Sequence, residues 1–187
     1  MTNEKSLFIV SGPAGVGKDS VVQALCAAHE GIERSVTATT RAPRPGEQEG
    51  VNYYYFTVPE FEKLQAENGV LESNFYCGNY YGTVRFDVEK RLAAGRVVVL
   101  VIDVNGAASI KRLCPQATTV FLCPPSEQEL EKRLRGRGTE SEDKVRERLA
   151  RAKEELALAD TYDARLVNEK VDACAEQLYQ LIQACRA

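Results

Sequence analysis

The hydrophobic pattern of the chain alternates short apolar runs with amphipathic stretches. Residues 6–10 form a short apolar run, and after a glycine-rich turn residues 16–28 carry apolar side chains at helical spacing. Residues 97–102 and 118–122 form two more apolar, β-branched runs, each followed by a helical segment. Nearly continuous apolar runs are typical of strands that are buried on both faces of a parallel sheet. The pattern therefore predicts an α/β fold in which helices cover both faces of a parallel sheet.

The segment between residues 34 and 83 has a different pattern. Its short alternating runs, at 51–58 and 71–76, are separated by proline and glycine, and one helix is indicated at 60–68. We expect these residues to form a β-rich lobe that is inserted into the α/β core.

The C-terminal third of the chain is predominantly helical in pattern. Charged residues alternate along helical surfaces from 129 to 158, with a glycine-containing break at 136–139 that predicts a hinge. A short strand at 166–167 and a helix at 171–185 complete the predicted elements.

The composition describes an ordinary soluble protein and narrows the range of partners. At roughly 150 residues per domain, 187 residues allow one domain with insertions. The chain is 44% hydrophobic and 27% charged, as in globular proteins, and its net charge of -3 argues against a domain that covers a nucleic-acid polymer. Because no apolar run approaches the span of a bilayer or of a secretory signal, we expect no membrane contact and a cytoplasmic location.

A glycine-rich motif connects the first predicted strand to the first helix. It consists of Gly12, Pro13, Ala14, Gly15, Val16, Gly17 and Lys18. In a P-loop of this form the glycines let backbone N–H groups approach phosphate oxygens, while the helix N-terminus and the lysine supply positive charge. The next residue is usually a Ser or Thr that binds magnesium, whereas here Asp19 comes first and Ser20 second. We expect Mg²⁺ beside Ser20; the alternative is that Asp19 itself holds the metal.

Five further motifs follow the P-loop in order. They are T-T-R-A-P-R-P-G-E at 39–47, G-V-N-Y at 50–53, G-N-Y-Y-G-T at 78–83, I-D-V-N-G at 102–106 and G-R-G-T-E at 136–140. The series resembles the guanylate kinase family, whose members phosphorylate GMP with ATP.

The resemblance extends to about Asn168 and implies a single domain with the P-loop nucleoside monophosphate kinase fold. Residues 1–33 and 84–187 would form its core, residues 34–83 the GMP-binding lobe and residues 134–150 a helical lid. The implied partners are ATP and GMP, with Mg²⁺ as cofactor, in a monomer or a homodimer.

The resemblance also implies a site for the phosphate of GMP. It assigns Arg41, Arg44, Tyr53 and Tyr81 to this phosphate. Two guanidinium forks and two phenol donors suit a phosphomonoester dianion.

A second set of residues matches the family's guanine site. Glu72 corresponds to a carboxylate that accepts hydrogen bonds from N1–H and the exocyclic amine of guanine, a pattern that adenine lacks. Thr37 and Thr83 match the hydroxyl positions that complete the base site. At the end of the third strand the family usually has two acids that are separated by one residue. Here Val101 replaces the first acid and Asp103 remains as a GMP-binding residue.

Arginines around the glycine break resemble those of the family's lid. Arg133, Arg137 and Arg148 would close over the transferring phosphoryl group, whose charge positioned cations stabilise. Contacts to ATP are implied for the P-loop, Asp19, Ser20, Arg133 and Arg137. The implied catalytic residues are Lys18, Arg44, Arg137 and Arg148. The arginines that we assign instead to a solvated helix face are Arg135, Arg146 and Arg151.

Two other interpretations remain open from the sequence. A ribose 1,5-bisphosphate kinase of the same superfamily has a similar Lys-Asp-Ser loop but would not need Glu72 or the tyrosine-rich lobe. A guanylate-kinase-like domain that only binds proteins typically has a damaged P-loop, whereas Lys18 is intact here.

Overall fold

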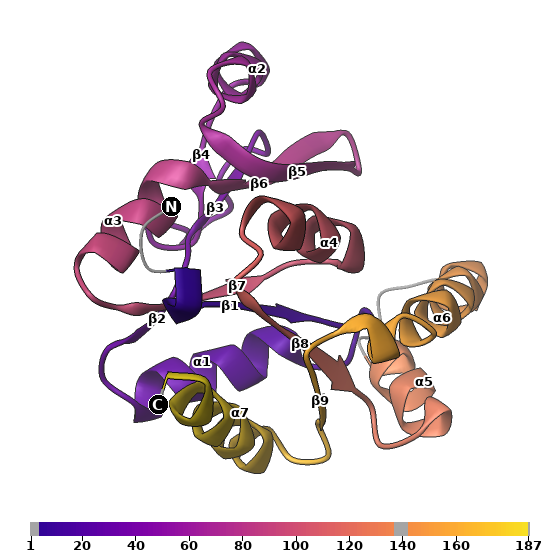
Figure 1. Cartoon of the computed structure of the whole chain (residues 1–187). Coiled ribbons are helices and arrows are strands. Elements are labelled where there is room, and N and C mark those ends of the chain that lie inside the picture. Colours follow the sequence, from indigo (N-terminus) through magenta and orange to yellow (C-terminus); the bar gives the residue numbers. More distant parts are fainter. Residues whose placement is uncertain (1–3, 137–141, 187) are drawn as a thin grey trace.

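A five-stranded parallel sheet forms the centre of the protein. The computed structural model describes residues 4–136 and 142–186, and the order of the central strands is β2-β7-β1-β8-β9 (Figure 1). These strands are β1 (Leu7–Ser11), β2 (Ile32–Arg34), β7 (Val97–Val101), β8 (Thr118–Cys123) and β9 (Ala164–Val167). The parallel sheet that the apolar runs predict is therefore confirmed.

Helices cover both faces of this sheet because alternate side chains of its strands point to opposite sides. On β1, Phe8 and Val10 belong to one apolar cluster, and Leu7 and Ile9 belong to another. The first cluster includes side chains of α1 and α7 and the second includes side chains of α3 and α4. Figure 1 shows these two pairs of helices on opposite sides of the sheet. These helices are α1 (Lys18–Ala28), α3 (Arg85–Ala93), α4 (Val104–Leu113) and α7 (Val171–Arg186). Helices on both faces are thus confirmed as well.

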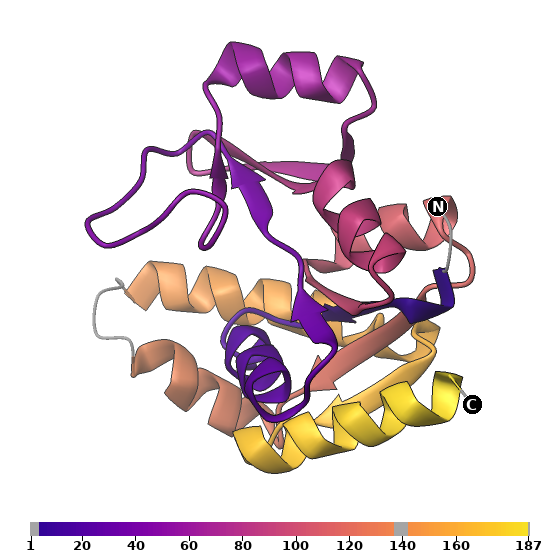
Figure 2. The same ribbon diagram turned by 90° about the vertical axis from the view of Figure 1, so that its left-hand side faces the viewer.

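A second, four-stranded sheet has the order β4-β3-β6-β5. Its strands are β3 (Thr37–Thr39), β4 (Tyr54–Tyr55), β5 (Val70–Tyr76) and β6 (Asn79–Val84). Strands β3 and β4 are parallel and the other pairs are antiparallel. Figure 2 shows this sheet and α2 (Val58–Ala66) at the end of the molecule opposite α7.

Helix α2 begins two residues earlier than the sequence pattern predicts. The reason is a capping box in which the Thr57 hydroxyl accepts from the Glu60 backbone and the Glu60 side chain accepts from the Thr57 backbone, with Pro59 in the first turn. The alternating run predicted at 51–58 shrinks to β4, since the helix takes its last residue. Phe61 of α2 is fully buried and packs in the small core of the second sheet.

A buried carboxylate connects the two sheets. Asp87 of α3 is 2% exposed and accepts hydrogen bonds from the Val36 backbone N–H at 2.9 Å and the Tyr54 hydroxyl at 3.0 Å. It also accepts from Arg91 Nε at 2.9 Å. Since Val36 immediately precedes β3 and Tyr54 begins β4, Asp87 fixes the second sheet to a helix of the core.

Two further helices lie side by side at one edge of the core (Figure 2). They are α5 (Glu127–Arg135) and α6 (Glu142–Leu156), and the remaining elements are the short 3₁₀ helices Glu4–Ser6 and Ala159–Thr161. Leu130 and Leu134 of α5 pack against Ala152 of α6. Among the described residues, no helix has both the length and the apolar composition that a bilayer crossing requires.

Candidate active site

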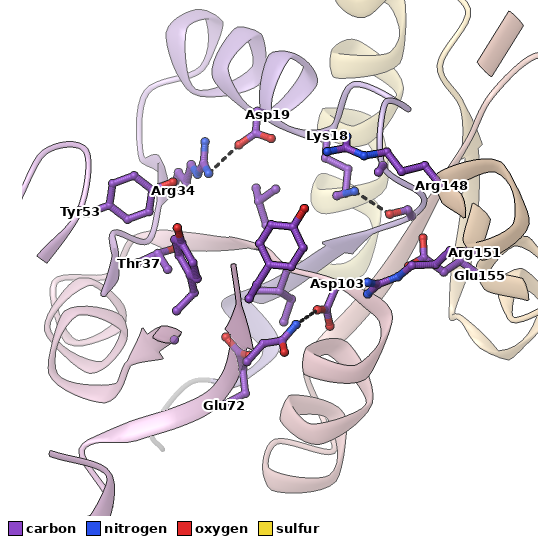
Figure 3. A pocket seen from close by; sticks show the side chains of 18 of the residues that line it. Lys18, Asp19, Arg34, Thr37, Tyr53, Glu72, Asp103, Arg148, Arg151 and Glu155 are labelled. Carbon is purple, nitrogen blue, oxygen red and sulfur yellow. Dashed lines mark hydrogen bonds and ion pairs between the residues drawn. The ribbon is translucent and has the colours of Figure 1, made fainter. Parts of the chain in front are cut away.

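A cleft of about 650 Å³ lies at the carboxyl ends of the central strands (Figure 3). The P-loop, the end of β7, strands β5 and β6 of the second sheet and helix α6 all contribute to its lining. Open parallel sheets hold ligands at this edge. The cleft therefore joins segments that lie far apart in the sequence.

The P-loop has the conformation that its glycines predict. Gly12 has a φ of 140°, and a Cβ atom there would lie 2.4 Å from the backbone oxygen of Leu122, so no other residue fits. Gly17 adopts the left-handed conformation at the N-cap of α1. Lys18 Nζ donates to the carbonyl oxygens of Gly12 at 2.6 Å and Pro13 at 3.1 Å. The lysine is thus folded back over the loop at the mouth of a helix N-terminus, a site suited to phosphate.

Asp19 is paired with a cation from the neighbouring strand. Its Oδ1 lies 2.7 Å from Nη2 of Arg34, the last residue of β2, and both residues line the cleft (Figure 3). Ser20 is exposed in the first turn of α1 and is not part of the cleft lining. The ion pair gives Asp19 a partner other than a metal ion.

The residues expected to read guanine are held together by the second sheet. The Thr83 hydroxyl donates to Glu72 Oε1 at 2.6 Å, and Thr37 is opposite Thr83 in the β3–β6 register. A Cβ on Gly106 would lie 2.9 Å from Glu72 Oε2, so this glycine makes room for the carboxylate. Burial raises the pKa of Glu72 above its ordinary value, the Thr83 hydrogen bond opposes the rise and the charge of Asp103 adds to it. Hydrogen bonds donated by a ligand stabilise the ionised form of such a buried carboxylate.

The residues expected to bind the GMP phosphate come together only in part. Tyr53, Tyr81 and Arg44 line the cleft, and the two tyrosine rings meet edge to face at 6.2 Å. Arg41 is not in the lining; its Nη2 donates to both oxygens of Glu47, at 2.9 and 3.0 Å, and its guanidinium lies 5.4 Å from the centre of the Tyr53 ring.

Glu47 organises the loop that carries both arginines, a role that the sequence did not reveal. Besides Arg41, it accepts from the Arg44 backbone N–H and the Tyr55 hydroxyl, each at 2.8 Å. The Arg41 guanidinium, followed by the Arg44 backbone donor, lowers the pKa of Glu47 to about 2. The only signal in the sequence was its place at the end of the T-T-R-A-P-R-P-G-E motif.

Asp103 lies between the core and the second sheet. Its Oδ1 caps α4 by accepting from the Gly106 backbone N–H at 2.9 Å, and its Oδ2 accepts from Asn74 Nδ2 of β5 at 2.8 Å (Figure 3). Val101, at the position of the missing acid, also lines the cleft. The remaining acid thus has a structural partner on each side.

The three arginines assigned to the lid have different surroundings. Arg148 of α6 lines the cleft. Arg133 lies outside the lining, where it pairs with Glu129 at 3.2 Å and donates to the Asn168 carbonyl at 3.1 Å. Arg137 lies outside the described residues.

Eight cleft residues were not predicted from the sequence as parts of the site: Arg34, Asn74, Tyr76, Gly82, Val101, Ile102, Arg151 and Glu155. Arg151, which we assign to a solvated helix face, is indeed exposed, with 51% of its side chain accessible, but it also lines the cleft. Arg151 follows Arg148 by three residues on one helix, a spacing that places both side chains on the same face. This spacing was the signal that could have found it. The predicted residues that lie outside the lining are Pro13, Gly15, Val16, Gly17, Ser20, Arg41, Thr83 and Arg133.

Comparison with known proteins identifies the family. The family model described as Guanylate kinase matches residues 4–185. The chain is 48% identical to a guanylate kinase of Gloeobacter violaceus over 176 residues, which are 94% of this chain and 86% of that protein. It is 48% identical to one of Thermobifida fusca over 180 residues, 96% of this chain and 92% of that protein. A crystal structure of guanylate kinase from Anaplasma phagocytophilum matches with a TM-score of 0.75 at 31% identity, covering 95% of this chain and 84% of that one. The chain belongs to the guanylate kinase family.

Proposed function

We propose that the cleft transfers the γ-phosphoryl group of ATP to GMP and so forms ADP and GDP. The chain is a nucleoside monophosphate kinase by family, and the comparisons favour neither a ribose 1,5-bisphosphate kinase nor a non-catalytic binding domain. The observation that carries the proposal is Glu72, a carboxylate bonded to Thr83 in a cleft that also contains the P-loop Lys18. The wall formed by the second sheet thus offers an acceptor for hydrogen bonds from guanine, and the P-loop wall offers a phosphate site.

The donor half of the reaction is assigned to the P-loop side of the cleft. Residues 12–20 bind the phosphates of ATP, and Lys18 neutralises charge as the phosphoryl group moves. Arg148 adds positive charge from α6, while Arg133 and Arg137 contact ATP. Positioned cations suffice for this chemistry because in-line transfer needs no covalent enzyme intermediate.

The acceptor half is assigned to the second sheet. Glu72 accepts hydrogen bonds from guanine with the help of Thr37 and Thr83, and Asp103 contributes from the end of β7. The GMP phosphate is bound by Arg44, Arg41, Tyr53 and Tyr81. For Arg41 to donate its Nη2 to the phosphate, the contact of that nitrogen with both oxygens of Glu47 has to be exchanged for the ligand.

The donor set around the P-loop fits a magnesium ion that arrives with the nucleotide. Among the described residues no cluster of three His, Cys, Asp or Glu could hold a metal on its own. Mg²⁺ is typically bound through substrate phosphates with few protein ligands, and the exposed hydroxyl of Ser20, two residues after Lys18, can supply one. When bound, the ion neutralises phosphate charge.

Three broader assignments belong to the same proposal. Residues 34–83 act as the GMP-binding lobe and residues 134–150 as a lid on a core of residues 1–33 and 84–187. The enzyme works in the cytoplasm as a monomer or homodimer on free nucleotides, without a nucleic-acid polymer or a membrane as partner.

A coupled ADP-release assay tests the proposal. GMP, dGMP, AMP, UMP and ribose 1,5-bisphosphate are offered as acceptors at equal concentration with ATP and Mg²⁺. We expect guanine nucleotides to rank first by a wide margin. Equal rates with AMP, a preference for ribose 1,5-bisphosphate or no transfer at all would each contradict it.

A further inference from the structure

Helix α6 presents an ion pair to the cleft, and the proposed function assigns no role to either of its residues. Arg151 Nε donates to Glu155 Oε1 at 2.9 Å, and both residues line the cleft (Figure 3). Glu155 is 8% exposed, whereas about half of the Arg151 side chain, 51%, remains accessible. The carboxylate is thus inside the protein and the guanidinium is at the cleft surface.

The buried carboxylate fixes where the guanidinium can lie. An ionised carboxylate in the interior is tolerated when it is paired, so Glu155 holds Arg151 in place. The contact uses Nε alone. Within residues 4–136 and 142–186 no other hydrogen-bond acceptor of Arg151 is found, which leaves both Nη groups to donate to a ligand.

The surroundings place Arg151 on the acceptor side of the cleft. The pKa of Arg151 is raised, chiefly by the hydrogen bond that it donates to Glu155 and further by the charges of Asp103 and Tyr76. Tyr76 belongs to β5, the strand that carries Glu72, and Asp103 is bonded to Asn74 of the same strand. Figure 3 shows the Arg151 guanidinium directed toward Asp103.

The loss of an acid at Val101 favours the same conclusion. A second carboxylate at the end of β7 would be a competing acceptor for an arginine in this cleft. Val101 is apolar, so Asp103 is the only acid that this strand end provides, and Asp103 already accepts from Gly106 and Asn74. The arginine therefore faces one carboxylate at this strand end rather than two, which favours the binding of an additional anion.

We propose that Arg151 is a further phosphate-binding residue of the acceptor half: its two Nη groups contact the phosphomonoester of the acceptor nucleotide, and Glu155 is its positioning residue. The planar fork of arginine matches two phosphate oxygens. The inference rests on the proposed function, because it takes GMP as the acceptor.

The test compares GMP with guanosine, which has the base but no phosphate. Dissociation constants are measured by calorimetry for the parent, Arg151→Gln, Arg151→Lys and the matched control Arg146→Gln, which lies on the same helix with a 73% exposed side chain. We expect Arg151→Gln to weaken GMP about 10-fold or more and to leave guanosine unchanged, as for the loss of a charge-assisted hydrogen bond. The dissociation constant of Arg151→Lys for GMP should lie between those of the parent and Arg151→Gln, and that of the control should match the parent.

A double variant keeps the test valid if Arg151→Gln alone fails to fold. Arg151→Gln with Glu155→Gln removes the buried charge together with its partner and should show the same loss for GMP. Glu155→Gln alone should weaken GMP less than Arg151→Gln does, and should add nothing in the Arg151→Gln background. An additive effect would show that Glu155 does not act through Arg151.

Separate outcomes overturn the inference and the function beneath it. A lowered melting temperature with an unchanged ratio of GMP to guanosine affinity would make the pair structural only. A loss confined to ATP would overturn the acceptor assignment. Failure of the parent enzyme to phosphorylate GMP would instead refute the proposed function.

Discussion

The two walls of the cleft are built from different parts of the chain. The P-loop wall is mainly backbone: Gly12 must lack a side chain because of Leu122, and Lys18 is held by carbonyl oxygens. The wall formed by the second sheet is mainly side chains: Glu72 is bonded to Thr83 on the sheet, and behind the cleft lining Arg41 is bonded to Glu47 in the loop that follows β3. Phosphate chains are common to all nucleotides, whereas a base is distinguished by the placement of individual donors and acceptors.

This difference predicts which substitutions each wall of the cleft tolerates. The P-loop wall should tolerate most changes of side chain except at its glycines and its lysine. The wall formed by the second sheet should be sensitive at several side chains, and also at buried groups that hold this sheet in place.

Lys18→Ala should have the largest effect on turnover. Its ammonium group is the one side-chain cation of the P-loop, and loss of such a charge from a transferring phosphoryl group costs about 10³-fold or more in kcat. Thermal unfolding should stay close to that of the parent, since the Lys18 side chain lines the open cleft and belongs to no apolar core cluster of the described residues. Lys132→Ala, at a 79% exposed position on α5, is the control. Turnover close to the parental value in Lys18→Ala would contradict the assignment.

Glu72→Ala should have the second-largest effect, because it removes the carboxylate that we propose as the acceptor of hydrogen bonds from guanine. We expect kcat/KM for GMP to fall about 10³-fold, in line with sites that depend on hydrogen-bonding groups of a substrate, and the KM for ATP to change little. Steady-state kinetics with GMP and AMP measure both effects. Glu62→Ala, on the exposed surface of α2, controls for the loss of a carboxylate. If a preference for GMP over AMP survives in Glu72→Ala, another residue reads the base.

The central sheet was predictable because burial on both faces imposes a continuous apolar pattern. Leu7 to Val10 are fully buried, and a run of this kind has few alternatives to a core strand. The strands β2 and β3 have three residues each, too few to show a period. Strand β6 contains Gly82, which is required because a Cβ there would lie 2.8 Å from the Glu72 backbone oxygen. Such tertiary contacts are invisible in a local pattern.

Within the site, motif positions could be predicted and their partners could not. The resemblance named Glu72 and Thr83, and the structure adds that they are bonded to each other. Glu155 gave no local signal, because its environment depends on how α6 packs beside the end of β7. Sequence motifs thus predicted the charged and polar side chains of the site. The residues that position those side chains became visible only in the folded structure.

Asp87→Ala should destabilise the protein and loosen the attachment of the second sheet to α3. The substitution leaves the Val36 N–H, the Tyr54 hydroxyl and Arg91 without their shared acceptor, and breaking a buried pair of this kind costs about 3 kcal/mol. Urea unfolding measures this loss. The KM for GMP should rise more than the KM for ATP, because the second sheet loses its attachment to α3. Glu89→Ala on the same helix removes an exposed pair with Arg85 and should be nearly neutral.

Glu72→Gln should make the protein more stable while it impairs GMP use. The pKa of Glu72 is raised by burial, so the folded state disfavours the ionised form and loses stability as pH rises from the ordinary value of 4.5 through the raised one. At neutral pH glutamine removes this small penalty, and the melting temperature should rise. Below the ordinary value the advantage should disappear, since the carboxyl group is then protonated in both states. Calorimetric melting curves from acid to neutral pH measure the difference, and a difference that does not depend on pH would contradict the burial argument.

The smallest effects should come from the two residues after the P-loop lysine. Asp19 is paired with Arg34 at 2.7 Å, but the two side chains are 71% and 41% exposed, and an exposed pair contributes little to stability. A carboxylate facing the phosphates without a cation would repel them, so a partner on β2 is compatible with phosphate binding. Asp19→Ser should therefore leave activity within a few fold, by roughly the 1 kcal/mol scale of such pairs. Ser20→Ala should raise the Mg²⁺ concentration needed for half-maximal turnover, because it removes the hydroxyl assigned to the ion. A magnesium titration of both variants at saturating ATP distinguishes the two residues. If Asp19→Ser shows the larger loss of magnesium affinity, the ion is held by Asp19, and the pair with Arg34 has to open whenever the nucleotide binds.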